Sequence, residues 1–389
     1  MIQVESIFSG GRGSSGEPLD PVEVYNNTRP SDWLPMPTPA DNEMYLLFHI
    51  PDGFSSLLAF TVTCTGNYTV ALGTMSGGSF VASSSVDIAS GSKYEAELFA
   101  DDYGDLTSDG MKQVMVKVSG TNIYTLTPST HSKKTSPSDF AGWNIVEIAC
   151  RLPRGTSVAC GRNTEKSALK KLRYFAWYGK NAVTDMSSMF NYCYSLTAIP
   201  QMDTSAVKDM SGTFSNCYSL TAIPQMDTSA VKDMNYMFNY CYSLTAIPQM
   251  DTSAVTTMSY MFNSCSSLTA IPQMNTSAVK DMDHMFNSCS SLTAIPPMDT
   301  SAVTDMSYMF NSCNSLTAIA FNSSATGWAG YAISLKDCSL SHAAIVAFFN
   351  SLPTITSAKA ITLTGNPGVP ELTDAEKAIA TGKRWTLTL

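Results

Sequence analysis

Residues 195–210 read SLTAIPQMDTSAVKDM, and the same segment returns unchanged at residues 219–234. Edited copies follow at the same period of 24 residues. A fixed period of this length is typical of a solenoid, in which each unit buries its apolar face against the next unit. We therefore expect residues 182–325 to form a stack of similar coils.

The apolar residues of each copy stand in fixed columns. Between Met186 and Cys193 they follow the i, i+3, i+4 and i+7 spacing that predicts two helical turns. Leu196 and Ile199 come next and predict a short extended segment, and the DTS triplet after them predicts a turn. The predicted core consists of these columns: Phe190, Cys193, Leu196, Ile199, Phe214, Cys217, Leu220, Phe238, Cys241, Leu244, Phe262, Cys265, Leu268, Phe286, Cys289, Leu292, Phe310, Cys313 and Leu316.

The order of the columns resembles a leucine-rich repeat with phenylalanine in the first leucine place. The longer pattern MFxxCxSLTxIP, followed by methionine and DTSxV, is similar to the BspA-like family of bacterial surface proteins over about residues 165–389. This resemblance implies a right-handed coil with a parallel sheet on one face. It also implies an extracellular adhesin or binding protein, or a tail protein of a phage or prophage of gut bacteria.

The segments on either side of the repeats are expected to cap the solenoid. Residues 171–186 align with the repeat without a gap, and the expected N-terminal cap, residues 159–181, carries basic residues that suit a terminal coil. Residues 326–389 predict two helices and short strands, with Thr373 at the start of the second helix. Such a segment would cover an otherwise open sheet edge.

The 10 cysteines of the chain raise the question of disulfides. Six of them, together with Cys338, fall in one column of the repeat. In stacked coils their side chains would lie parallel instead of facing one another, so we expect buried thiols.

Residues 29–158 follow a different pattern, in which short β-type runs such as SLLAFTVTC and NYTVALG alternate with turn signals. This pattern favours an all-β sandwich or jelly roll. The preceding residues 1–28 are rich in glycine, serine and proline and are expected to be extended. Two interpretations of the β-domain remain open: a domain that docks to a larger particle, or a carbohydrate-binding-like domain.

The sequence shows no pattern typical of a catalytic or metal site. The acidic stretch 101–109 lacks the spacing of an EF-hand loop, and turn or cap bonding explains the aspartate columns of the repeat more simply than a cation does. We predict no enzymatic activity, no metal and no cofactor, with a polysaccharide-acting enzyme in the β-domain as an alternative. Four histidines lack a partner at metal-ligand spacing: His49, His131, His284 and His342.

One set of aromatic residues varies between the copies and is expected to face outward. Tyrosine and asparagine are typical of glycan- and protein-binding surfaces, and repeated weak sites can bind a polymer tightly. Alternatively, the rings coat the convex side without binding anything. The candidate ligand-binding face consists of Tyr192, Tyr194, Tyr218, Tyr236, Tyr240, Tyr242, Tyr260, His284 and Tyr308, with Asn191, Asn239, Asn263, Asn287 and Asn311 among them.

Composition and the first residues bear on partners and location. The net charge of −9 and the absence of a basic run argue against nucleic-acid binding. The first residues lack the charged and apolar regions of a signal peptide, and no stretch reaches the ~18 apolar residues of a membrane span. We therefore expect a chain that folds in the cytoplasm, does not span a membrane and works in a virion or at a bacterial cell surface.

These expectations combine into one hypothesis about function. The chain is expected to be a non-enzymatic adhesion or binding protein whose solenoid recognises a bacterial surface glycan or protein, favoured as a receptor-binding protein of a phage or prophage tail. Its N-terminal domain would contact other tail proteins, and a homotrimer is one expected assembly. The alternative setting is a bacterial surface adhesin exported by an unrecognised route.

Overall fold

The computed structural model describes residues 30–52, 55–104, 106–108, 110–128, 145–161, 168–199, 202–319 and 332–389. The chain divides into two compact units. The first comprises residues 1–185, 189–206 and 222–226, and the second comprises residues 186–188, 207–221 and 227–389. The expected extended segment 1–28 lies outside the described residues. The division between the two units falls within the repeats, because the first coil is grouped with the sheet domain.

The first unit is built on a mostly antiparallel sheet with the strand order β3-β2-β5-β1-β6-β8. Short strand β4 continues the edge along β2, β7 pairs with β5, and β6 pairs with β8 in parallel. Leu46 and Phe48 of β1 and Val116 of β5 are fully buried in its core. The elements are β1 (Glu43–Pro51), β2 (Ser55–Ser76), β3 (Ser79–Ala89), β4 (Lys93–Phe99), a 3-10 turn (Ala100–Asp102), β5 (Met111–Pro128), β6 (Ile145–Arg151), β7 (Ser157–Val158) and β8 (Tyr174–Trp177).

The described strands of this unit pair into one sheet, so the expected sandwich or jelly roll, which would have two sheets, is not confirmed. The sequence suggested a turn between SLLAFTVTC and NYTVALG, but both runs belong to β2. The chain passes the intervening glycine through irregular pairing between Thr63 and Tyr68 without reversing. Likewise, residues 111–128 form one strand, β5, across Gly120. Bulges of this kind keep a long strand in a sheet while they bend it.

The expected N-terminal cap joins the sheet of the first unit. Tyr174–Trp177 forms β8, which pairs with β6, and Tyr174 also bridges to Ala198 of the first coil. The N–H groups of Ser195 and Thr197 donate to carbonyls of Lys170 and Arg173 at 3.1 and 3.2 Å. The first coil is therefore added to the sheet edge by the same parallel pairing that joins β8 to β6.

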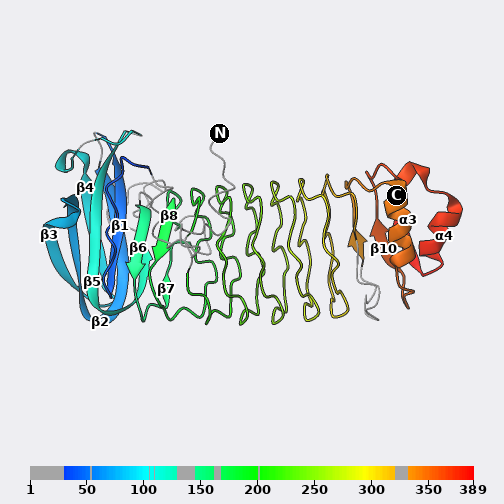
Figure 1. Cartoon of the computed structure of the whole chain (residues 1–389), viewed down its shortest axis with the longest axis horizontal. Helices are drawn as coiled ribbons and strands as arrows, with labels where there is room; N and C mark the ends of the chain where they lie inside the picture. Colours follow the sequence, from blue (N-terminus) through cyan, green and yellow to red (C-terminus); the bar gives the residue numbers. More distant parts are fainter. Residues whose placement is uncertain are drawn as a thin grey trace, which may run out of the picture. The chain divides into compact units, whose positions relative to one another are not determined.

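The second unit is a stack of 24-residue coils, which Figure 1 shows as successive green to orange loops. Along one side, the N–H of each threonine of the SLTA segment donates to the threonine carbonyl of the preceding coil, at 3.1 to 3.5 Å for Thr245 to Thr317. A second line of contacts consists of parallel bridges from Asp209 through Asp233, Thr257 and Asp281 to Asp305. The parallel sheet implied by the resemblance is thus reduced to isolated bridges along these coils.

The segment expected to be helical is instead a chain of turns. Tyr236 and Tyr240 have left-handed φ angles of 56° and 59°, which a right-handed helix excludes. The N–H groups of Tyr236, Phe238 and Tyr240 donate to carbonyls of the next coil. Those of the intervening Asn239 and Cys241 close turns within their own coil. These turns therefore place apolar side chains at the same spacing as a helix would. Their backbone N–H groups donate in part to the next coil and in part within their own coil.

The expected core columns are buried in both units. In the second unit the phenyl rings of Phe214, Phe238 and Phe262 are stacked with centroids 5.7 and 5.5 Å apart, and the stack continues to Phe310. All ten cysteines are buried and none is disulfide-bonded. The thiols of Cys241 and Cys265 donate to phenylalanine carbonyls of the preceding coil, both at 3.1 Å. The cysteine column therefore ties neighbouring coils together without covalent bonds.

The C-terminal part of the second unit closes the stack with a small parallel sheet and helices (Figure 1). The strand order is β11-β10-β9. Thr373 caps its helix as expected, in a reciprocal capping box with Glu376. The elements are β9 (Ile333–Ser334), α3 (His342–Ser351), β10 (Lys359–Thr362), a 3-10 turn (Val369–Glu371), α4 (Asp374–Thr381) and β11 (Trp385–Thr388).

Candidate functional site

The aromatic residues expected to bind ligand differ in exposure. Tyr236, Tyr240, Tyr242 and Tyr308 are exposed by 43, 38, 41 and 54 %. The remaining members of the set are half-buried, and Tyr192 and Tyr194 among them belong to the first unit. The other members, all in the second unit, form two groups with different geometry: an aromatic ladder (Tyr236, Tyr260, His284 and Tyr308) and a tyrosine cluster (Tyr218, Tyr240 and Tyr242).

The aromatic ladder consists of one ring from each of four successive coils. The centroids of Tyr236 and Tyr260 are 4.7 Å apart with their planes 9° from parallel. His284 continues the stack 4.4 Å from Tyr260, and Tyr308 lies 4.8 Å from His284. Because each inner ring has a neighbour on both faces, the ladder presents ring edges to the solvent. A sugar that stacks on an aromatic face would find both faces of the inner rings, Tyr260 and His284, already covered.

The backbone under the ladder is held in an unfavourable conformation. All four ladder residues have left-handed φ angles between 52° and 56°. This conformation costs an ordinary residue about 1–2 kcal/mol, and glycine adopts it without that cost. Gly212 does occupy the same place in an earlier coil, with φ 58°. Ser188, one period before Gly212, has φ 54°, so the conformation belongs to the coil whatever residue stands there. The stacked rings join successive coils, so the ladder contributes to the structure of the stack.

Carboxylates flank the middle of the ladder. The Nδ1 atom of His284 lies 2.7 Å from Oδ1 of Asp283. Burial raises the pKa of Asp283, the carboxylates of Asp305 and Asp281 raise it further, and the contact with His284 opposes the rise. Burial and the Asp283 carboxylate also raise the pKa of the Tyr260 phenol. The ladder edge therefore combines uncharged phenol groups with an acidic border.

The tyrosine cluster has a different geometry from the ladder. The rings of Tyr218 and Tyr242 are tilted by 38° at a centroid distance of 5.1 Å, and those of Tyr240 and Tyr242 by 59° at 5.9 Å. Tilted rings leave part of each face uncovered. Burial and the two neighbouring phenols raise the pKa of Tyr242, so its phenol stays neutral at physiological pH. The cluster is thus an uncharged aromatic patch with accessible ring surface.

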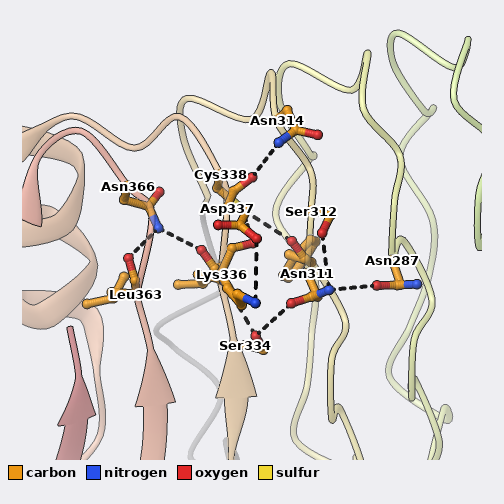
Figure 2. Close-up of polar contacts among 12 residues, drawn as sticks. Asn287, Asn311, Ser312, Asn314, Ser334, Lys336, Asp337, Cys338, Leu363 and Asn366 are labelled. Atoms are coloured by element: carbon orange, nitrogen blue, oxygen red, sulfur yellow. Dashed lines mark hydrogen bonds and ion pairs between the residues drawn. The ribbon is translucent and has the colours of Figure 1, made fainter.

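Four of the five asparagines expected on the same face, Asn239, Asn263, Asn287 and Asn311, hydrogen-bond to neighbouring coils instead. The Nδ2 group of Asn263 donates to Oδ1 of Asn239 at 2.8 Å, and that of Asn287 donates to Oδ1 of Asn263 at 2.7 Å. Figure 2 shows the ladder continuing from Asn287 through Asn311 to Ser334 at the final coil. When asparagine recurs in register, the side-chain amide of one coil can donate to the amide oxygen of the next, so these side chains stabilise the stack. The recurrence of asparagine in one column was the available sequence signal for this role.

A further buried asparagine organises the C-terminal end. Asn366 donates through Nδ2 to the carbonyl of Leu335 at 2.7 Å and to that of Leu363 at 2.8 Å, and its Oδ1 accepts the N–H of Leu340. Figure 2 shows the contact between Asn366 and Leu363. No repeated column of the sequence contains this residue, so no signal pointed to it. Its contacts satisfy backbone groups where the regular inter-coil bonding ends.

The acidic and histidine residues weighed from the sequence have local partners. Asp227 and Asp251 each accept the N–H and hydroxyl of the serine two residues later, and these bonds lower the pKa of both carboxyl groups. His49 lies 2.8 Å from the Gln113 amide, and His342 pairs with Glu376. His131 and part of the acidic stretch 101–109 lie outside the described residues. Within the described ranges, no three metal-ligating side chains come together.

The β-domain is the alternative location of an enzyme site, and two of its side chains with catalytic or substrate-stacking chemistry are Trp33 and Glu147. Trp33 is buried against His49, with ring centroids 4.7 Å apart, and Glu147 is fully buried. Burial raises the pKa of the Glu147 carboxyl well above its usual range. Neither side chain presents a surface to a substrate.

Comparison with known proteins bears on the repeats. A family model described as "Mycoplasma protein of unknown function, DUF285" matches residues 166–270 and 244–336, together a little less than half of the chain. The match supports the resemblance of the repeats to BspA-like leucine-rich repeats. A search of curated proteins finds no match.

Among solved structures, a crystal structure of a T. pallidum leucine-rich repeat protein (TpLRR) is similar at 15% identity and a TM-score of 0.35. The similarity covers 62% of this chain and 91% of that one. It is too weak to bear on the fold or function of this chain. Separately, the described helices include none with the length and apolar character needed to cross a bilayer.

Proposed function

We propose that the chain is a non-enzymatic binding protein that recognises a glycan or protein of the bacterial surface through the tyrosine cluster of its solenoid. The observation that carries this proposal is the exposure of Tyr240 and Tyr242 at tilted angles on one coil. Large, rigid rings with a hydrogen-bonding hydroxyl give contact area at a small cost in side-chain entropy.

The scaffold suits this role because hydrogen bonds to the neighbouring coils hold the backbone around Tyr240 and Tyr242 in place. The N–H of Tyr240 donates to the Asn263 carbonyl at 2.8 Å, and Cys241, next in the chain, donates its thiol to Phe214. The cluster lies between two core columns whose side chains are fully buried, Phe238 and Leu244. A ligand would therefore meet rings whose backbone is already ordered, which reduces the entropy lost on binding.

The aromatic ladder is not included in this proposed site. Its inner ring faces are covered by one another, and its residues form a repetitive structural stack. Along the same columns as Tyr240 and Tyr242, later coils carry serine at 264, 266, 288 and 290. The cluster is consequently a local patch and not a track along the whole solenoid. A compact epitope fits it better than an extended polymer.

For the biological setting we infer a tail-associated receptor-binding protein of a phage or prophage, in which the β-domain docks to other tail proteins and the solenoid meets the host cell. A bacterial surface adhesin is the alternative setting. Support for both comes from the resemblance of the repeats to BspA-like proteins. Identification of tail genes beside the coding gene would favour the first, and their absence with surface labelling of the producing bacterium would favour the second.

The proposal is tested with the full-length chain on a glycan array and on a panel of whole gut bacteria. Tyr240→Ser combined with Tyr242→Ser should abolish or strongly reduce any binding that the unchanged protein shows. The control is Tyr308→Ser, which removes a more exposed tyrosine from the ladder end and should leave binding unchanged. Equal binding by all three proteins, or loss only with the Tyr308 variant, would refute the assignment to the cluster.

A further inference from the structure

The outer strand of the β-domain, β3, has an unusual degree of exposure. It is the last strand in the sheet order, so among the described residues it has a strand neighbour, β2, on one side alone. Nine of its eleven residues are exposed, and the other two are half-buried. An unpaired edge of this length is a template for another strand unless charge, proline or a covering element blocks it.

The same sheet edge offers an internal comparison. Strands β3 and β4 follow one another along β2. β4 carries Lys93, Glu95 and Glu97 within seven residues. β3 carries Asp87 as its single charged residue, and the Thr69 hydroxyl of β2 donates to that carboxylate at 2.6 Å. Charge therefore protects the β4 part of the edge and leaves the β3 part open.

An apolar row on β3 continues the core face of its neighbour. Val86 lies opposite the buried Val70, and Val81 lies opposite Thr74. The register shift between Ala82 and Ser84 places Val81 and Val86 on the same face, although five positions separate them in sequence. These valines are exposed by 50 and 44 %. The face of the sheet that is buried at Val70 of β2 is therefore exposed to solvent at the neighbouring Val86 of β3.

We propose that β3 is a self-association edge, to which β3 of a second copy of this chain adds in antiparallel orientation. Residues 81–86 read VASSSV, which is nearly palindromic. A two-fold axis between Ser83 and Ser84 would place Val81 of each copy opposite Val86 of the other. The bulge lies at this axis, so each half of the strand keeps a regular register.

A second copy fits this edge better than a partner of different charge. Antiparallel pairing about a two-fold axis needs a self-complementary sequence, and VASSSV meets that need with two valine pairs and small residues between them. The open edge carries no unpaired charge that a basic or acidic partner strand would match. The pairing would cover the valine row and hydrogen-bond the outer edge of β3.

The test is sedimentation velocity of the full chain across a concentration series. The unchanged protein should shift from the 41.9 kDa monomer toward a dimer as concentration rises. Val81→Lys with Val86→Lys places like charges opposite each other twice and should weaken dimerisation about tenfold or more. The control, Phe99→Lys with Leu106→Lys, makes the same charge change at two other exposed apolar positions of this unit and should dimerise normally.

A cross-linking experiment tests the register even if the lysine variant fails to fold. A mixture of Val81→Cys and Val86→Cys chains should form a disulfide-linked dimer under mild oxidation, and Val81→Cys alone should not. A monomer at every concentration, a trimer, a lysine variant that dimerises normally, or equal cross-linking of Val81→Cys with itself would each overturn the proposal. Ligand binding through the solenoid is measured separately and does not depend on this result.

Discussion

Replacing Phe238 with alanine should lower the free energy of unfolding by about 3–5 kcal/mol. The Phe238 ring is fully buried and stacks between Phe214 and Phe262, with planes 9° and 10° from parallel. Truncation leaves a cavity and breaks both stacks. Because each aromatic pair contributes about 0.5–1.5 kcal/mol beyond its buried area, we expect a loss in the upper part of the range.

Equilibrium unfolding in urea, followed by circular dichroism, measures the total loss. A solenoid can unfold in parts, so hydrogen exchange read by mass spectrometry should also be measured for peptides of the substituted coil and its neighbours. Phe238→Leu should lose less than Phe238→Ala, and Tyr308→Ala should stay within about 1 kcal/mol of the unchanged protein because its ring is exposed. A loss below about 1 kcal/mol for Phe238→Ala, or faster exchange in the β-domain alone, would refute the stacked-core interpretation.

Three further predictions concern the buried thiols, the asparagine ladder and the C-terminal cap. Burial raises the pKa of Cys289 to about 12. The folded protein should therefore resist iodoacetamide at pH 8, whereas all ten cysteines should react in urea. Rapid labelling of Cys289 in the folded protein would contradict this prediction. Asn263→Asp removes the donor to Asn239 and should destabilise the fold by about 1–3 kcal/mol at pH 7. The stability should recover in part at pH 4, because a protonated carboxyl can donate again. Equal urea midpoints at the two pH values would argue against the asparagine ladder. Capping hydrogen bonds from Thr373 and the contact with His342 lower the pKa of Glu376 to about 2 from 4.5, so its contribution is present above pH 4.5 and is lost as the pH falls toward 2. Glu376→Gln should therefore lower the thermal midpoint at pH 7 and flatten its decline in that acid window, and an unchanged profile would exclude this role.

The repeat columns could be predicted from the sequence because the apolar positions recur with so little variation. Phe238, Cys241 and Leu244 lie in the core where the columns place them. The backbone between them could not be predicted in the same way. A helix and a series of turns with left-handed residues at Tyr236 and Tyr240 put the same side chains inward, so apolar spacing does not distinguish the two.

The candidate surface was predicted in part, because the exposure of a side chain depends on its neighbours in the stack. Tyr240 and Tyr242 are exposed, but Asn239 is 7 % exposed although it precedes Tyr240 directly. Its amide is satisfied by groups in other coils, which a single copy of the repeat does not contain. In the β-domain, Gly66 and Gly120 suggested turns, and the long strands β2 and β5 accommodate them through irregular pairing that residue propensities do not indicate.

The shared hydrogen bonds between coils have a consequence for how such a protein can change in length. Each coil of the second unit offers its neighbour the same donors, acceptors and ring faces that it receives from the coil before it. Loss of one period, for example residues 243–266, would join Tyr242 to Ser267, which occupies the place of Ser243 in the next copy. The two newly adjoining surfaces would match without any other substitution. Recombination between the repeated gene segments could therefore shorten or lengthen the solenoid in steps of one coil, about 5 Å each, while leaving both ends intact.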